Sequence, residues 1–262
     1  MRLLFLTDTH IRAYAPVSRC DNFQETVFAK LAEVLEIARD LQVDLVLHGG
    51  DLFDAARVGY GLMGRTAELL RGFPCPVYVV PGNHDLVGYS LQTLPHTSLG
   101  VLWRAGVFRL LLEPELLEGA GFNLVLWPVP AAAEIPTSAY VTGRPQPAFY
   151  VIVTHDALLP SPAHPDIPHK VIAPDLSDAD LVLAGHWHPG WAETIVSGRT
   201  SYVNPGSLLR MDAGPGSRDR EVRVVLVTCG PGGAVVEYIP LRSARPFAEV
   251  FRARKGDAGD RV

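Results

Sequence analysis

Side chains that can bind metal ions follow five short apolar segments of this chain. They are Asp8 and His10, His48 and Asp51, Asn83 to Asp85, His155, and His186 and His188. Six of the nine histidines fall at these positions. Imidazole, carboxylate and amide oxygen together suit Mn, Fe or Zn, and no thiolate is present to form a purely structural zinc site. A single histidine at such a position has many ordinary explanations. Because potential metal ligands follow all five segments, however, the sequence predicts one shared metal site.

The number of candidate ligands indicates more than one ion. The set is Asp8, His10, Asp51, Asn83, His155, His186 and His188. Two ions about 3.5–4 Å apart, sharing one carboxylate, would use all of them. Such a pair stabilises the attacking and the leaving oxygen of an in-line displacement at phosphorus. The residues therefore predict a dinuclear centre for phosphoryl chemistry.

Buried strands are expected to position these side chains. The apolar segments are residues 3–6, 43–47, 77–80, 149–153 and 180–184, each nearly continuous in hydrophobicity. Continuous runs of this length favour strands that are buried on both faces of a sheet. Ligands of open α/β sheets bind beyond the carboxyl ends of the strands, so the five groups should meet at one edge. Glycines at 49, 50, 82 and 185 suit tight turns close to the ions.

The segments between the strands predict helices and a closing hairpin. Apolar residues recur at helical spacing from Phe23 to Ala38, and Asp21 followed by Gln24 predicts a capping box at its start. Residues 61–71 predict a weaker helix, 122–127 a strand, 128–148 a loop, and 222–228 with 234–239 a β-hairpin. This alternation is typical of βαβ units and an α/β fold.

Composition narrows the class of protein. The 262 residues are 48% hydrophobic and 19% charged, which predicts a folded globular chain. The net charge of −5 creates no overall basic field that would attract nucleic acid or an anionic membrane. Cys20, Cys75 and Cys229 are odd in number and widely spaced, which excludes a disulfide framework. No apolar run approaches the length of a membrane span or a signal sequence, so we expect a cytoplasmic protein without membrane contact.

We expect one catalytic domain over residues 1–241, followed by a basic C-terminal tail over 242–262. The tail holds six basic residues against three acidic ones. Its weak periodicity is typical of a solvated or partner-docking end.

The ordered blocks Asp-x-His, Gly-Asp, Gly-Asn-His-Asp, His and Gly-His-x-His, spread over residues 8–188, resemble the calcineurin-like metallophosphoesterases. The resemblance implies an α/β fold of two packed mixed β-sheets flanked by helices, a four-layer sandwich, with the late hairpin in the second sheet. It also implies roles for individual residues. Asp8, His10 and His188 would bind the first metal, Asn83, His155 and His186 the second, and Asp51 both. His84 would contact the phosphate and assist the leaving oxygen, while Asp85 would orient His84.

Two further stretches resemble the SbcD-like branch of DNA-repair exonucleases. They are residues 47–54, ending in Asp54, and residues 204–210, which would bring Ser207 and Arg210 toward the substrate. The resemblance covers the catalytic core and implies two divalent ions, with Mn²⁺ favoured over Fe or Zn. It implies phosphodiester hydrolysis, with DNA as the substrate and an ATPase as a partner subunit. His48 lies outside the ligand set and is expected to support it.

Two alternatives stay open from the sequence, as does the oligomeric state. The protein could be a phosphodiesterase or phosphatase for small nucleotides or other phosphorylated metabolites, because its acidic charge gives a polyanion no long-range attraction. It could also be a scaffold that kept the fold and lost catalysis, although no ligand position is broken.

Overall fold

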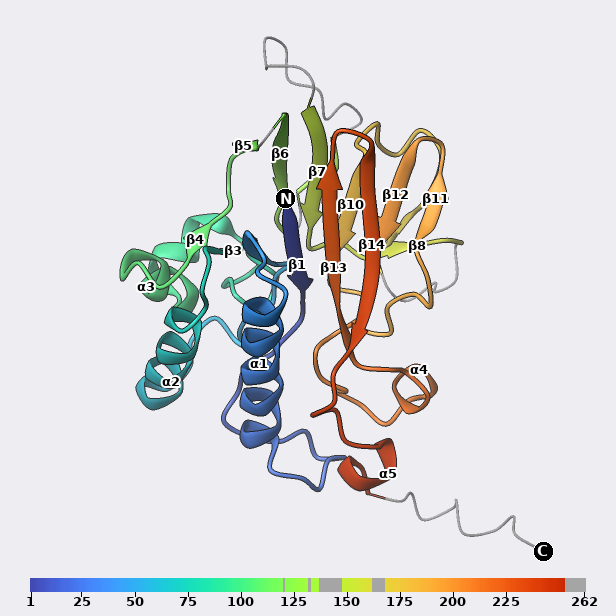
Figure 1. Ribbon diagram of the computed structural model, residues 1–262. Coiled ribbons are helices and arrows are strands. Elements are labelled where there is room, and N and C mark those ends of the chain that lie inside the picture. Colours follow the sequence, from blue (N-terminus) through green and yellow to red (C-terminus); the bar gives the residue numbers. More distant parts are fainter. Residues whose placement is uncertain (120, 132, 137–147, 162–167, 253–262) are drawn as a thin grey trace, which may run out of the picture.

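The computed structural model describes residues 1–119, 121–131, 133–136, 148–161 and 168–252. Over these residues the strands form two six-stranded sheets and one two-stranded sheet (Figure 1). The first sheet has the order β14-β13-β1-β2-β3-β4. Its strands are β1 (Arg2–Leu6), β2 (Leu45–His48), β3 (Val77–Val79), β4 (Arg109–Leu110), β13 (Arg223–Gly230) and β14 (Gly233–Pro240). The strands β1 to β4 run parallel, and β13 joins β1 antiparallel.

The second sheet has the order β11-β12-β10-β7-β6-β5. Its strands are β5 (Glu115–Gly119), β6 (Phe122–Val129), β7 (Ala148–Thr154), β10 (Leu181–Ala184), β11 (Ile195–Ser197) and β12 (Thr200–Val203). The four central strands are parallel, while β5 and β11 pair antiparallel at the edges. The two short strands β8 (Leu158–Leu159) and β9 (Lys170–Val171) form the small sheet.

The expectation of two packed mixed sheets flanked by helices is confirmed, but the place of the hairpin is corrected. The hairpin β13–β14 extends the first sheet, with Leu4 of β1 opposite Leu226 of β13. The reason is burial on both faces. Val224 and Leu226 pack under the helices, whereas Val225 and Val227 face the other sheet. A strand that is apolar on both sides belongs inside a covered sheet, and β1 offers its free edge.

Helices cover the outer face of the first sheet. They include α1 (Phe23–Asp40), α2 (Tyr60–Arg71) and α3 (Ser98–Arg104), and Figure 1 shows α1 and α2 together on that side. The capping residue of α1 is Asn22 rather than Asp21, because the Asn22 side chain accepts from the amide of Glu25. Asp21 instead accepts hydrogen bonds from Arg19 and Thr26.

Alternating side chains of the strands divide the core into three layers. Leu3 and Phe5 of β1 point into the space between the sheets, where they meet residues such as Leu124 of β6. Leu4 and Leu6 point to the helices on the other side. The outer face of the second sheet is covered, within the described residues, by side chains from loops and short strands: Ile135, Leu158, Ile172 and Trp191.

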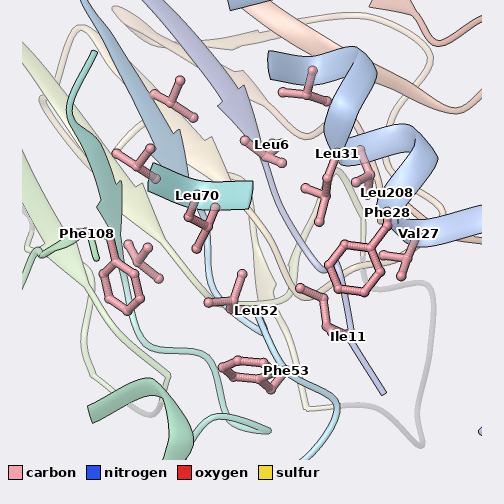
Figure 2. Packing of buried hydrophobic residues seen from close by; sticks show 14 of the residues in the cluster. Leu6, Ile11, Val27, Phe28, Leu31, Leu52, Phe53, Leu70, Phe108 and Leu208 are labelled. Carbon is pink, nitrogen blue, oxygen red and sulfur yellow. The ribbon is translucent and has the colours of Figure 1, made fainter. Parts of the chain in front are cut away.

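Figure 2 shows that the helical layer also fixes the loops that follow the strands. Ile11 lies beyond β1, Leu52 and Phe53 lie beyond β2, and Leu208 lies in a later loop. All four side chains are buried and pack in the same cluster as Phe28 of α1 (Figure 2). The chain immediately beside the candidate ligands is therefore anchored in the core.

The remaining described elements are short. They are the 3₁₀ helix η1 (Leu91–His96), α4 (Pro215–Arg218) and α5 (Phe247–Val250). The three cysteines are free, as expected. No helix in the described part of the chain combines the length and apolarity needed to cross a bilayer.

The described part of the predicted tail is seated on the rest of the protein. Glu33 of α1 accepts from the amides of Arg242 and Ser243, both at 2.8 Å. The amide of Cys20 donates to the Val250 carbonyl at 2.9 Å, and the Arg252 amide donates to that of Ser18 at 3.0 Å. Residues 253–262 of the predicted tail, and 137–147 of the predicted loop, lie outside the described residues. The domain boundary at 241 stays a prediction.

Candidate metal centre

The loops after β1, β2, β3, β7 and β10 bring the candidate ligands together. Within the described residues, three sets of His and Asp side chains have ligand atoms within 4.8 Å of one another. They are Asp8, His10 and His188; His10, Asp51 and His84; and Asp51, His155 and His186. Both sheets therefore contribute to one site, at the carboxyl ends of their parallel strands.

The first set, Asp8 with His10 and His188, has the geometry of a cation site. The Nε2 atoms of His10 and His188 lie 2.9 Å apart, and Oδ1 of Asp8 lies 3.8 and 3.5 Å from them. This oxygen is buried and has no hydrogen-bond partner among the described residues. A buried carboxylate oxygen is costly without a partner, and a cation between these three atoms would supply one.

The second set centres on Nε2 of His155. Asn83 Oδ1 lies 3.0 Å from this nitrogen, Asp51 Oδ2 3.2 Å and His186 Nδ1 3.3 Å. Nδ1 of His155 lies 2.7 Å from the Gly49 carbonyl, to which it donates. This hydrogen bond fixes the tautomer and leaves the lone pair of Nε2 for a metal ion, an arrangement common around metal-binding histidines. These residues fit a second ion.

Asp51 lies between the two sets. Its Oδ2 atom is 3.2 Å from His155 Nε2 and 3.7 Å from His10 Nε2. Its Oδ1 atom accepts a hydrogen bond from the His84 amide at 2.8 Å, which fixes the orientation of the carboxylate. One buried carboxylate thus faces both groups, as a bridging ligand must.

The electrostatics of the site favour positive charge. Burial alone would raise the pKa of Asp8, but contacts with His10 and His188 hold it well below its usual range. Burial likewise opposes the charged imidazolium of His10, yet the carboxylates of Asp54, Asp8 and Asp51 raise its pKa to about 10. Metal ions bind deprotonated ligands, so divalent cations would displace protons from this pocket.

Four candidate ligands have an unusual backbone conformation. Asp8, His10, Asp51 and His186 have φ angles of 53°, 42°, 53° and 66°, in the left-handed region. Asp and His tolerate this region better than most residues, although each such residue still costs free energy. Strain concentrated at ligand positions indicates that the folded core imposes these conformations on the loops.

Two glycines allow the strand ends to approach one another. A Cβ atom at Gly82 would lie 2.1 Å from Asp51 Oδ1 and 2.2 Å from the Asp51 amide nitrogen. A Cβ atom at Gly185 would lie 2.3 Å from the Thr7 hydroxyl oxygen. Any side chain at these positions would displace the loops that hold the ligands.

His84 is exposed beside the two groups, and its expected contact with Asp85 is corrected. The ring Nδ1 of His84 donates to the Asp54 carbonyl at 2.8 Å. The carboxylate of Asp85 instead accepts from the amides of Leu52, Phe53 and Gly82, and the side chain is fully buried. Because the Asp85 carboxylate accepts these backbone hydrogen bonds in the candidate ligand loops, it does not orient the His84 imidazole.

Asp54 performs the positioning that the sequence assigned to Asp85. Its carbonyl holds His84, and its Oδ1 atom lies 3.1 Å from Nδ1 of His10. The other carboxylate oxygen accepts from Arg12 at 2.7 Å. A carboxylate on the far nitrogen of a ligating histidine orients that ring toward the metal.

His48 lies outside the ligand sets, as expected. Its Nδ1 accepts from the Gly50 amide at 3.3 Å, so Nε2 carries the proton and donates to the Thr9 hydroxyl at 3.1 Å. Burial lowers its pKa to about 4, which keeps the ring neutral at physiological pH. The residue ties together the loops after β1 and β2.

The side chains of Ser207 and Arg210 donate hydrogen bonds to backbone carbonyls. The Ser207 hydroxyl donates to the Leu209 carbonyl, and the Ser207 amide donates to the His188 carbonyl at 3.0 Å. Arg210 donates to the carbonyls of Arg245 and Arg220 at 2.9 and 2.7 Å. The Ser207 amide connects the loop of residues 204–210 to His188 of the candidate pair His186 and His188. Substrate binding by Ser207 and Arg210 stays a prediction.

Two buried cations, Lys30 and Arg19, and the half-buried Arg220, none of which the sequence revealed, hold successive carbonyls of this loop. Lys30 donates to Leu208 at 2.9 Å, Arg220 to Leu209 at 3.2 Å and Arg19 to Arg210 at 2.6 Å. Burial and the neighbouring arginines hold the pKa of Lys30 well below its usual range. One signal was available, because Lys30 falls at the same helical spacing as the buried face of α1.

Comparisons with known proteins indicate the family of this chain. The family model of the calcineurin-like phosphoesterases matches residues 1–190. The double-strand break repair protein MRE11 of Encephalitozoon cuniculi is 24% identical over 297 residues, which cover 94% of this chain and 48% of that protein. The DNA double-strand break repair protein Mre11 of Methanosarcina mazei is 27% identical over 223 residues, which cover 81% of this chain and 34% of that protein. The chain therefore spans less than half of the length of these relatives.

A solved structure with the same fold is a dimetal phosphatase from Danio rerio. It is 12% identical in sequence. The superposition covers 92% of this chain and 96% of the phosphatase chain, with a TM-score of 0.56. The family match begins at Met1, before β1, and extends past His186 and His188, so every loop with a candidate ligand lies inside it. We conclude that the chain belongs to the calcineurin-like phosphoesterase family of metal-dependent hydrolases.

Proposed function

We propose that this protein hydrolyses phosphodiester bonds at a dinuclear metal centre, with DNA as its substrate. The observation that carries the proposal is the position of Asp51 between two sets of ligands, with His84 beside them. Asp8, His10 and His188 would hold one ion, and Asn83, His155 and His186 the other. Mn²⁺ is the proposed ion at both positions, since imidazole and carboxylate ligands suit it as well as Fe or Zn.

The ions, when bound, supply Lewis acidity and a water that is nucleophilic at neutral pH. His84 supplies a different function. Because its Nδ1 donates to the Asp54 carbonyl, the proton on that nitrogen is held, and Nε2 is the nitrogen left for substrate. A ring nitrogen of His84 lies within 4.8 Å of ligand atoms of His10 and Asp51. In its doubly protonated form, with the second proton on Nε2, the ring can neutralise a phosphoryl oxygen and pass that proton to the departing alkoxide, which leaves a neutral imidazole.

Support for DNA comes from the relatives. The MRE11 protein of Encephalitozoon cuniculi, named as a double-strand break repair protein, aligns with 94% of this chain. Hydrolysis of DNA ends, substrate contact by Ser207 and Arg210, and an ATPase partner belong to the same proposal. Contact by these two side chains requires that they exchange hydrogen bonds with the backbone for bonds with phosphate.

The test compares hydrolysis of a phosphodiester, a phosphomonoester and DNA. Purified protein with MnCl₂ should hydrolyse bis-p-nitrophenyl phosphate faster than the p-nitrophenyl monoester, and should degrade single-stranded or duplex DNA. The Asp51→Ala variant should do neither. A protein that hydrolyses only the monoester would contradict the proposal.

One observation favours a second candidate, hydrolysis of small nucleotide diesters. The net charge of −5 provides no long-range attraction for a polyanion. In this case activity on a dinucleotide would exceed activity on a long strand and would depend little on salt. DNA binding would instead weaken steeply as salt increases.

A further inference from the structure

A pocket of about 320 Å³ opens beside His84. It shares Asn83 and His84 with the metal centre, and its other walls include Ala55, Ala56, Leu86 and Tyr89. A site of this size suits a small ligand, and its lining combines apolar side chains with polar groups that could orient one. Neither the metal ligands nor the proposed chemistry explains the apolar part.

Tyr89 presents an aromatic ring at this pocket in an unusual way. Its side chain is 62% exposed although its ring is large and mostly apolar. Its backbone has φ of 58°, directly after Gly88 with φ of 59°, so two successive residues are left-handed. This conformation is rare for an aromatic residue and is often found at functional sites.

The turn that carries Tyr89 is held by hydrogen bonds on both sides. The Val87 amide donates to the Thr93 hydroxyl at 3.0 Å, and that hydroxyl donates to the Ser90 carbonyl at 2.7 Å. The Ser90 amide donates to the Val87 carbonyl at 3.3 Å. The strained turn is therefore closed without a ligand, and the backbone of Tyr89 is held at the pocket.

We propose that this pocket binds the base of the nucleotide on the leaving-group side of the scissile phosphate, with Tyr89 stacked on that base. The inference rests on the proposed function and adds a substrate class, a diester whose leaving group is a nucleoside. His84 determines the side, because it both lines the pocket and protonates the leaving oxygen in the proposed chemistry. Stacking on an aromatic side chain tolerates every base, since each base has a π face.

The kinetic test uses three dinucleotides with one phosphodiester each. One is thymidylyl-thymidine, and the other two carry an abasic sugar on one side or the other. Tyr89→Ala should raise KM about tenfold for the full dinucleotide, whereas Tyr89→Phe should stay within about twofold. The analogue without a base on the leaving side should be a poor substrate already and should not respond to Tyr89→Ala. A thymidine oligonucleotide serves as a fourth substrate. Comparing it with the dinucleotide shows whether the base in the pocket belongs to a DNA strand or to a free dinucleotide.

Tyr60→Ala is the matched control. Tyr60 is 88% exposed at the start of α2 and does not line this pocket. Its removal should leave all four substrates unchanged. Equal effects of Tyr89→Ala on both abasic analogues, or no effect on any substrate, would overturn the stacking role while leaving diester hydrolysis intact.

A binding measurement tests the pocket without turnover. Saturation-transfer NMR with thymidine should show contact at the base protons in the wild-type protein, and this contact should be lost in Tyr89→Ala and kept in Tyr89→Phe. Absence of transfer in the wild-type protein would refute the subsite. Transfer from a protein that hydrolyses only monoesters would instead place the error in the proposed function.

Discussion

At the scale of single residues, the ligand positions combine two demands on one side chain. Asp8, His10, Asp51 and His186 must offer a ligand atom and also adopt a left-handed backbone. Asp and His meet both demands, because they bind metals and are enriched in this region of φ. Replacement by a β-branched or bulky residue would therefore remove the metal-binding atom and would also disfavour the left-handed backbone.

Asp51 is the single residue on which both ions should depend. The Asp51→Asn variant should contain far less than two equivalents of metal, because its neutral amide cannot bridge two dications. Metal analysis after gel filtration measures this. Asp44→Asn, an exposed carboxylate just before β2, should keep the full content. Two bound equivalents in Asp51→Asn would refute the bridging role.

His84 should affect turnover without affecting the metals. It is exposed, so His84→Ala should fold normally and keep both equivalents. Loss of a positioned acid or base lowers rates by about 10²- to 10⁴-fold, and we expect kcat on a phosphodiester to fall in that range. The exposed His96 provides the control, His96→Ala. An unchanged kcat in His84→Ala would show that the residue serves another purpose.

At the scale of elements, the site depends on how closely strand ends approach. Gly82→Ala should destabilise the protein by about 1–3 kcal/mol and reduce metal content, because the new Cβ would overlap Asp51. Gly64→Ala in α2 is the matched control. It has open space around it and should raise stability by about 0.5–1 kcal/mol. Thermal unfolding and metal analysis measure both, and equal metal content in the two variants would contradict the argument.

The strands were predictable, and the sequence could identify candidate ligands beside them, because both signals are local. A buried run such as residues 43–47 is recognisable in the sequence, and Asp51 follows it within a few residues. The choice of Asn22 over Asp21 as cap was not predictable, because both residue types cap helices and the pattern does not show that Arg19 and Thr26 bind the Asp21 carboxylate. The sheet that receives the hairpin and the contact between Lys30 and Leu208 were not predictable for another reason, because packing between remote segments fixes them.

The short elements α3, β4 and β5 were missed for a different reason. The strand β4 has two residues and α3 has seven, too few to show a period. The role of Asp54 was also missed. Its contact with His10 follows from the bend after β2, which brings a carboxylate three residues beyond Asp51 back over the ring.

At the scale of the whole molecule, residues beyond the family match complete the structure. The match ends at residue 190, yet β12 pairs with β10 and β13 pairs with β1 only after that point. Both β1 and β10 are followed by candidate ligands. A chain shortened to the matched region would therefore leave each of these two strands with an open edge.

Stability of the whole molecule should decrease in acid partly through His48. Burial places its folded pKa at about 4, below the ordinary 6.5. The folded state binds the proton less readily than the unfolded state, so this contribution to stability is complete above pH 6.5 and is lost as the pH falls toward 4. The loss amounts to at most about 3 kcal/mol.

Denaturant unfolding of the metal-free wild type and of His48→Gln between pH 4 and 7 measures this difference. Gln keeps polar atoms near Thr9 and has no proton to gain. We expect a smaller decline of unfolding free energy in the variant, and parallel declines would show that other groups dominate.

The seating of the C-terminal segment has a mechanical consequence. Arg19 forms a bridge with Phe251, and its guanidinium holds the Arg210 carbonyl at the end of the loop behind His188. One residue thus connects the segment of residues 247–252, through its backbone, with the loop beside the metal centre, through its side chain. Displacement of that segment should therefore disturb the loop. The exposed thiol of Cys20, whose Sγ lies 3.6 Å from the Glu249 carbonyl, offers a natural place for a fluorescent reporter of that displacement.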